Sequence, residues 1–221
     1  MKTVRNCSLR LRVLALMLIP ILYSCHYSEI PLEPEQDFFP LSEKAKTVYK
    51  KEFISTADES VWATDTVTLS VSGDTLIDGL TYKKIINEYG LLEKVVRREG
   101  GKYFGRNHEM YGGFTMEYLF LDVNVPANGM WDHIKEEGMT KTEYVVKEVK
   151  SNQVINGIEY KNVTKIEVNY YNKYNDGINF ELNYSALHYY ADGVGEIYTY
   201  YPYPASGMFC DLNISILPAS K

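Results

Sequence analysis

Residue types that often carry chemistry are few and scattered in this chain of 221 residues. His108-Glu109 lacks the second histidine, four residues on, that a zinc protease motif requires. Asp132-His133 has suitable types for an acid–base pair, but adjacent residues of a strand point to opposite faces. His188 shares the apolar face of its predicted strand, so we expect a hydrogen-bonded core residue there. Asn172–Gly177 has one carboxylate and no closing glutamate, so we interpret it as a turn rather than a calcium loop.

The chain also lacks a Gly-x-Ser-x-Gly elbow, a glycine-rich phosphate loop and a Cys-x-x-Cys pair. We therefore predict no catalytic residues, no metal site and no cofactor. The chain is predicted not to be an enzyme.

Tyrosine is the one chemically versatile residue in excess, with 20 copies. Its ring offers a broad apolar face, and its hydroxyl tolerates water. Two interpretations stay open for the tyrosines that crowd the final third of the chain. They fill half-buried strand positions, for which tyrosine is favoured, or they form a stacking surface for a sugar or an apolar ligand. For the second interpretation the candidate ligand-binding residues are Tyr198, Tyr200 and Tyr201, with the first two on one face of a strand and Tyr201 on the other.

The elements that must position these residues are strands. Apolar and polar residues alternate over 66–71, 165–170, 178–186 and 210–216, as in an antiparallel sheet with one wet face. Only Leu41–Lys51 could carry a short helix. We predict a mainly β protein of antiparallel meanders. Turn pairs that favour tight hairpins separate the strands: Asp78-Gly79, Gly100-Gly101, Asn128-Gly129, Asn156-Gly157 and Asp176-Gly177.

A repeat is visible at an offset of 78, where residues 74–85 (DTLIDGLTYKKI) align with residues 152–163 (NQVINGIEYKNV). Either this is a good hairpin sequence that recurs by chance, or it marks an internal duplication. We favour the duplication, because the match extends beyond the turn. Two related meanders would form a half-barrel curled around a cleft or a two-sheet sandwich. The identical pairs are Ile77/Ile155, Gly79/Gly157, Tyr82/Tyr160 and Lys83/Lys161.

The N-terminal segment is typical of an export signal. Four basic residues precede Val13–Leu22, an apolar run of about ten residues, whereas a bilayer span needs roughly 20. Leu22-Tyr23-Ser24-Cys25 then resembles the bacterial lipobox, in which the cysteine is lipidated and becomes the mature N-terminus. We predict a signal peptide over 1–24 and lipidation of Cys25; an ordinary signal peptide with an incidental cysteine is the alternative.

The next residues predict a tether. Residues 26–40 hold four acids, three prolines and no lysine or arginine, as in an extended solvated segment. We therefore divide the chain into 1–24 (signal peptide), 25–40 (lipidated acidic tether) and 41–221 (β-domain), the last either one unit or two related lobes at about 41–135 and 136–221. Removing the four leading basic residues leaves 19 basic against 29 acidic residues, a formal charge of −10. So acidic a chain excludes nucleic acid as a partner.

Several segments of the chain are hairpin signatures: Phe39-Pro40-Leu41, the Ile77-Asp78-Gly79…Tyr82-Lys83 hairpin, Val96–Tyr103, Glu117–Asp122 with Trp131, and His188–Ile197 (HYYADGVGEI). These segments are similar to those of uncharacterised lipoproteins and secreted proteins of Bacteroidetes. The chain departs from that family at Val125–Met130, where the family usually has a Gly-Asp turn before the tryptophan. The resemblance covers most of residues 39–200 and implies a location and a β-fold rather than an activity.

Together these features predict a non-catalytic lipoprotein, anchored by lipid to the bacterial outer membrane, with the periplasmic and surface faces both open. Its expected partner is an apolar or lipid-like small ligand or an envelope protein. The alternative is a surface glycan-binding accessory lipoprotein that uses a tyrosine-rich face.

Replacing the lipidated residue tests the anchor. We expect Cys25→Ser to release the protein from the membrane fraction or to stall its processing, because several acyl chains are needed for stable anchoring. The control Cys7→Ser should do neither. Intact-mass measurement of the membrane-extracted protein should show an N-terminus at Cys25 that carries acyl chains, and an unmodified soluble protein with another N-terminus contradicts the prediction.

Overall fold

The computed structural model describes residues 38–108, 113–135, 138–173, 179–202 and 210–218, and every regular element in these ranges is a β-strand. The expected mainly β, antiparallel class is confirmed. No helix in the described ranges is long and apolar enough to cross a membrane. The strands are β1 (Lys46–Ser55), β2 (Val61–Ile77), β3 (Leu80–Asn87), β4 (Leu92–Glu99), β5 (Lys102–Asn107), β6 (Tyr118–Asp122), β7 (Met130–Ile134), β8 (Thr140–Ile155), β9 (Ile158–Asn172), β10 (Glu181–Ala191), β11 (Gly195–Tyr201) and β12 (Cys210–Ile216).

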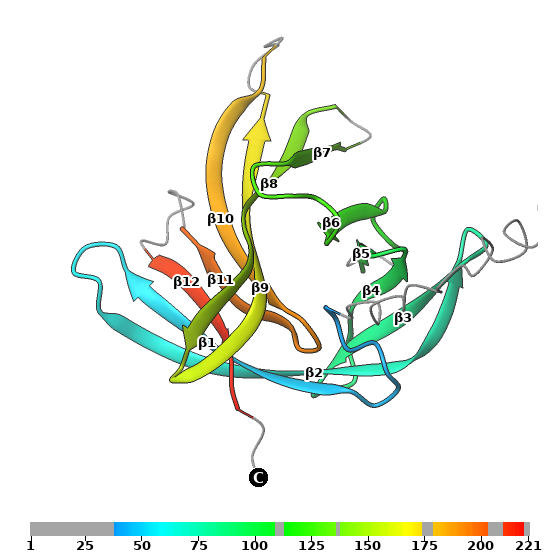
Figure 1. Cartoon of the computed structure of the whole chain (residues 1–221), viewed down its shortest axis with the longest axis horizontal. Coiled ribbons are helices and arrows are strands. Elements are labelled where there is room, and N and C mark those ends of the chain that lie inside the picture. The colour runs from blue at the N-terminus through cyan, green and yellow to red at the C-terminus, as the bar shows by residue number, and fades with distance from the viewer. Residues whose placement is uncertain (1–37, 109–112, 136–137, 174–178, 203–209, 219–221) are drawn as a thin grey trace, which may run out of the picture. The chain divides into compact units, whose positions relative to one another are not determined.

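All twelve strands belong to one antiparallel sheet with the order β6-β5-β4-β3-β2-β1-β12-β11-β10-β9-β8-β7. The sheet is a continuous meander whose first and last strands pair with each other, from Tyr49 opposite Ile216 to Ser55 opposite Cys210. Its two edges are β6 and β7, and the sheet curls into a nearly closed, barrel-like form (Figure 1). Of the two architectures expected from sequence, the half-barrel is therefore the one observed, and the described residues form neither a two-sheet sandwich nor two separate sheets.

The repeated sequence forms the same element twice. Asp78-Gly79 joins β2 to β3 and Asn156-Gly157 joins β8 to β9, each as a two-residue hairpin. The φ angles are 51° and 79° at the first turn and 51° and 76° at the second. Both hairpins join the second and third strands of a six-stranded run, so they occupy equivalent places in the two halves of the sheet. The expectation of two glycines at hairpin tips with positive φ is confirmed.

The interior begins earlier in the chain than the sequence suggested. Phe38 is 2% exposed and Phe39 is 9% exposed, and the Phe38 amide donates to the Tyr103 hydroxyl over 2.8 Å. These two phenylalanines lie within the segment assigned to the solvated tether, yet they pack inside the sheet with Phe120 and Tyr190. The short helix considered for 41–51 is replaced by the start of β1.

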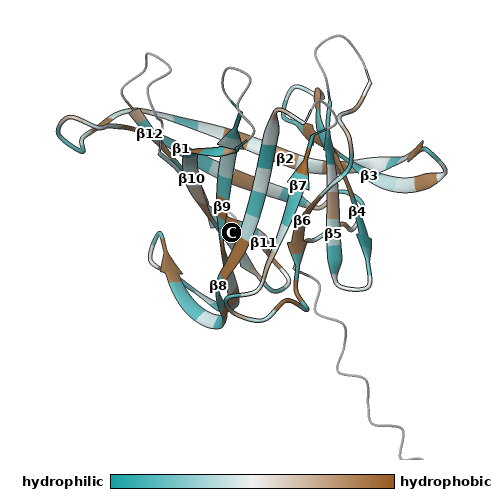
Figure 2. Ribbon diagram, turned by 90° about the horizontal axis from the view of Figure 1, so that it is seen from above, coloured by the Kyte–Doolittle hydropathy of each residue, from teal (hydrophilic) through white to brown (hydrophobic). Residues whose placement is uncertain are grey.

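Residues change between polar and apolar along the strands, as the sequence alternation required (Figure 2). A second interior cluster forms where the β8–β9 hairpin bends over the junction of β1 and β12, and it contains Tyr49, Val163, Ile197 and Ile216. At the hairpin tip the Asn156 side-chain amide donates to the Ser215 hydroxyl and to the Ile216 carbonyl, each over 3.0 Å. The hairpin thereby joins two parts of the chain about sixty residues apart.

Side chains bridge the seam between the two edge strands. The Trp131 indole on β7 donates to the Leu119 carbonyl on β6 over 2.8 Å, and it stacks on Tyr144 with a ring separation of 5.2 Å. The rings of Tyr118 and His133 also meet across the seam at 6.5 Å. Side chains therefore close the barrel-like sheet between β6 and β7, where backbone pairing stops.

Substitution at the two hairpin tips tests their backbone strain. A Cβ built on Gly79 or Gly157 has no neighbour within 4 Å, so the cost of a side chain there comes from φ alone. We expect Gly79→Val and Gly157→Val each to lower the free energy of unfolding by about 1 kcal/mol or more, because β-branched residues tolerate positive φ poorly. Urea unfolding measures this. The controls Gly79→Asn and Gly157→Asn should lose less, since asparagine adopts the left-handed region more readily; equal losses for valine and asparagine contradict the prediction.

Candidate functional site

A cavity of about 540 Å³ lies inside the barrel-like sheet. This volume falls within the range of roughly 300–1,000 Å³ that is typical of small-molecule sites. Strands from both halves of the sheet contribute to its wall, and so do residues on both sides of the seam. Five tyrosines line it: Tyr118, Tyr144, Tyr170, Tyr190 and Tyr201; the other lining residues are Lys94, Asn107, Thr115, Met116, Phe120, His133, Lys135, Thr142, Val168, His188 and Glu196.

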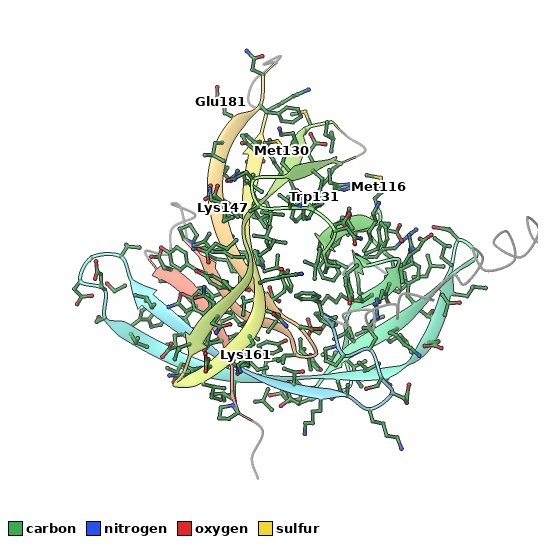
Figure 3. The ribbon with its side chains drawn as sticks, in the orientation of Figure 1. Met116, Met130, Trp131, Lys147, Lys161 and Glu181 are labelled. Carbon is green, nitrogen blue, oxygen red and sulfur yellow. The ribbon has the colours of Figure 1, made fainter. Side chains whose placement is uncertain are left out.

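The register of the strands explains why space remains between the tyrosines. Tyr144 lies opposite Val168, and Tyr170 lies opposite Thr142, so each large ring on β8 or β9 faces a smaller side chain. Two of the rings are held by further stacking, Tyr170 on Tyr184 at 4.5 Å and Tyr144 on Trp131 at 5.2 Å. These two rings of the wall are therefore held by their neighbours. Figure 3 shows Trp131 and Met116 on either side of the seam that borders the cavity.

A β-bulge turns one acidic residue inward. Tyr189 pairs with Tyr198, but the next residue, Tyr190, pairs with Glu196, which leaves Ile197 as an extra residue in β11. Strict alternation would place Glu196 on the same face as Tyr198. Because of the bulge, Glu196 shares the face of Tyr190 and lies in the cavity wall.

Glu196 forms the polar centre of the site. Its Oε1 atom lies 2.7 Å from His188 Nδ1 and accepts a hydrogen bond from the Thr199 hydroxyl at 2.6 Å. Since a carboxylate accepts, His188 donates to Glu196 through Nδ1. His188 Nε2 is buried and has no hydrogen-bond partner among the described residues. The Glu196 side chain is 23% exposed, and the residue lines the cavity.

The surroundings keep this carboxylate ionised. Burial raises the pKa of Glu196, but the hydrogen bond and charge of His188, the charge of Lys94 and the Thr199 hydroxyl outweigh burial and lower it to about 2. Burial and the Glu196 charge together raise the pKa of Tyr118 to about 12, and the pKa values of Tyr170, Tyr190 and Tyr201 are also raised, chiefly by burial. At neutral pH the cavity thus presents one carboxylate among protonated phenols.

Two lysines line the cavity together with this carboxylate. Lys94 Nζ lies 5.7 Å from the centre of the Phe39 ring and 5.6 Å from that of Phe120, inside the wall. Lys135 lies at an exposed position just after β7. The described residues contain no group of three or more histidine, cysteine, aspartate or glutamate side chains that could hold a metal ion.

The tyrosines expected to bind ligand are divided between the two faces of β11. Tyr201 lines the cavity. Tyr198 donates to Asn213 over 2.9 Å and Tyr200 donates to Asp211 over 2.8 Å, both toward β12 and away from the cavity. These three residues therefore do not form one site, and Cys25 lies outside the described residues.

The structure also shows where the histidines and acids considered from sequence lie. His188 is 8% exposed and hydrogen-bonded, as expected for a core residue, and it also borders the cavity. His133 lines the cavity, while its neighbour Asp132 is exposed. The His108 ring meets the Phe114 ring edge to face, with a centroid separation of 5.7 Å. Sequence reasoning missed Glu196, because only the bulge places it inside.

A second polar cluster outside the cavity is fully paired. Arg97 binds Glu117 with two hydrogen bonds of 2.7 Å each, and Tyr82 donates to the same carboxylate. Arg106 in turn contacts the Tyr82 hydroxyl at 3.1 Å and Asp78 at 2.9 Å. This network ties β3, β4 and β5 to the segment before β6, so its role is structural.

The fold and the site together define a nearly closed antiparallel β-protein with an internal cavity of ligand size. No family model and no curated protein matches the chain. Two solved structures are similar to it, each with a TM-score of 0.42. A candidate lipoprotein from Parabacteroides distasonis ATCC 8503 is 11% identical, and the match covers 83% of this chain and 98% of the other. A candidate exported protein with a YmcC-like fold from Bacteroides fragilis NCTC 9343 is 10% identical, with coverage of 82% and 97%.

The acid stability of the protein tests the Glu196 site. The pKa of Glu196 falls from its ordinary 4.5 to about 2 on folding, so its contribution is complete above pH 4.5 and is lost as the pH falls toward 2. Over that interval we expect the stability advantage of the wild type over Glu196→Gln to shrink by up to roughly 3 kcal/mol. Urea unfolding at a series of pH values measures it. The control Glu181→Gln, an exposed position on β10, should follow the wild type; a difference for Glu196→Gln that does not change with pH contradicts the prediction.

Proposed function

We propose that this protein is a non-catalytic, lipid-anchored binding protein of the bacterial outer membrane that holds a small ligand inside its barrel-like sheet. The observation that carries the proposal is the cavity of about 540 Å³ with its tyrosine wall and one ionised carboxylate. A few convergent polar groups in an aromatic-lined hollow are what small-molecule sites share. A concave interior of this size favours a small ligand over the envelope protein also considered from sequence.

The geometry of His188 favours binding over catalysis. A general base needs a ring nitrogen within reach of the reacting proton. Nδ1 of His188 is engaged by Glu196 and Thr199, and Nε2 is buried. The histidine therefore orients and stabilises the carboxylate. Glu196, at a pKa of about 2, is a weak base and serves as a hydrogen-bond acceptor.

The lipid anchor at Cys25 and the outer-membrane location rest on the N-terminal sequence. A lipidated protein needs no further attachment, so its folded body is free to present the cavity. The periplasmic and surface faces of the membrane are both compatible with this arrangement.

A single-tryptophan reporter tests ligand binding. The chain has two tryptophans. Trp62 is 60% exposed near the tip of the β1–β2 hairpin, whereas Trp131 stacks on Tyr144, which lines the cavity. In a Trp62→Phe background, Trp131 is the remaining tryptophan, and excitation that selects tryptophan over tyrosine reports on it alone. We expect a saturable change in its emission with at least one of four probe classes: neutral saccharides (glucose, galactose, N-acetylglucosamine and maltose), palmitate, spermidine or inorganic phosphate.

A blocking variant locates the signal. Thr142→Phe places a ring in the cavity wall and should abolish the emission change. Thr66→Phe makes the same substitution at an exposed position on β2 and should preserve it. No saturable change with any probe, or a change that survives Thr142→Phe, contradicts the proposed function.

A further inference from the structure

We infer that the ligand of the cavity is an uncharged saccharide, and that the second carboxylate oxygen of Glu196 accepts a hydrogen bond from one of its hydroxyl groups. This inference rests on the proposed function and names the chemical class of the ligand.

The Glu196 carboxylate has one oxygen that can accept a hydrogen bond from a ligand. His188 and Thr199 both engage Oε1 of Glu196, and no described residue forms a hydrogen bond with Oε2. The 23% of the side chain that stays exposed belongs to a residue lining the cavity. A charged acceptor held in a fixed orientation forms stronger hydrogen bonds than a neutral one. A hydroxyl group that replaces cavity water would satisfy it.

The charges of the wall favour a neutral ligand. A cationic ligand would approach Glu196, but Lys94 already opposes this carboxylate and Lys135 adds a second ammonium group to the lining. An anionic ligand would meet the lysines, but it would also lie in the same cavity as an ionised carboxylate. An uncharged ligand avoids both repulsions and leaves the interactions of Glu196 with His188 and Lys94 unchanged.

The rings favour a saccharide over an alkyl chain. Tyrosine rings offer flat faces for the C–H face of a sugar ring, and their hydroxyls offer donors and acceptors. The stacked pairs Tyr170–Tyr184 and Tyr144–Trp131 hold these faces in place, which lowers the entropy cost of binding. A lipid tail would displace the water around Glu196 and return no hydrogen bond, which is unfavourable for an ionised group. The apolar or lipid-like ligand expected for a half-barrel therefore fits this wall less well than the sugar of the alternative hypothesis.

The test uses the Trp62→Phe reporter with the same probes. We expect saturable binding of at least one of glucose, galactose, N-acetylglucosamine and maltose at millimolar concentration, and none of palmitate, spermidine or inorganic phosphate. Glu196→Gln should weaken that binding roughly ten- to hundred-fold, the range for a lost hydrogen bond to a charged group. Glu181→Gln, at an exposed position, should leave it unchanged.

A second pair of variants covers the case in which Glu196→Gln unfolds. Tyr201→Phe removes a hydroxyl from the cavity wall and keeps the ring, so it should weaken saccharide binding but leave an alkyl ligand unaffected. Tyr198→Phe makes the same change on the opposite face of β11 and should have no effect. Circular dichroism confirms that each variant is folded.

The outcomes separate this inference from the proposed function. Binding of palmitate, spermidine or phosphate that Thr142→Phe abolishes overturns the saccharide assignment and leaves the proposed function standing. Saccharide binding that neither Glu196→Gln nor Tyr201→Phe weakens also overturns the assignment. Absence of binding by every probe overturns both.

Discussion

The pairing of the first strand with the last is the contact on which the rest of the structure depends. A meander of twelve strands has no interior until its ends meet, and here β1 and β12 join through seven residue pairs. This closure places Lys94 of β4 in the same cavity as Glu196 of β11, although a hundred residues of chain separate them. The strands at the opposite ends of the sheet, β6 and β7, do not pair with each other, and the Trp131 indole joins them through the Leu119 carbonyl. One junction is made by backbone and the other by a side chain, so the two differ in the ease with which they can open.

The width of the sheet explains why a cavity exists. About eight strands enclose an interior that side chains can fill, whereas wider barrels enclose a cavity or need a plug. This sheet of twelve strands encloses a cavity and also has part of its interior filled by other segments of the chain. Phe38 and Phe39 enter the interior from the N-terminal side, and Gly195 lets them approach, since a Cβ there would lie 3.3 Å from Pro40 and 3.4 Å from Phe39. The β8–β9 hairpin supplies the second interior cluster, and the cavity is the part of the interior that neither filling occupies.

The sequence allowed the strands, the hairpin tips and the half-barrel to be predicted, because alternation and Asn-Gly or Asp-Gly pairs act over a few residues. Phe38 and Phe39 were misplaced for a related reason: the acids and prolines before them indicate a solvated segment, and the burial of two aromatic rings depends on distant strands. Glu196 was missed because a single extra residue, Ile197, reverses the alternation of β11. Nothing local distinguishes this bulge from a regular strand. The division of Tyr198 and Tyr200 from Tyr201 did follow from alternation, but which face encloses the cavity depends on the closure of the whole sheet.

The bulge in β11 and the closure of the sheet together place and stabilise the charged Glu196 side chain. An ionised carboxylate inside a protein is unfavourable unless it is paired and hydrogen-bonded. Glu196 meets this condition with partners from its own strand, from β10 and from β4: Thr199, His188 and Lys94. The first two are placed by the local pairing of β10 with β11, whereas Lys94 is brought in by the curvature of the whole sheet. A group whose stabilisation needs the closed form in turn favours that form, so the residue assigned here to bind ligand also stabilises the wall around it. Ligand binding and folding are therefore expected to reinforce each other, since both are strongest when the sheet is closed and Glu196 is ionised.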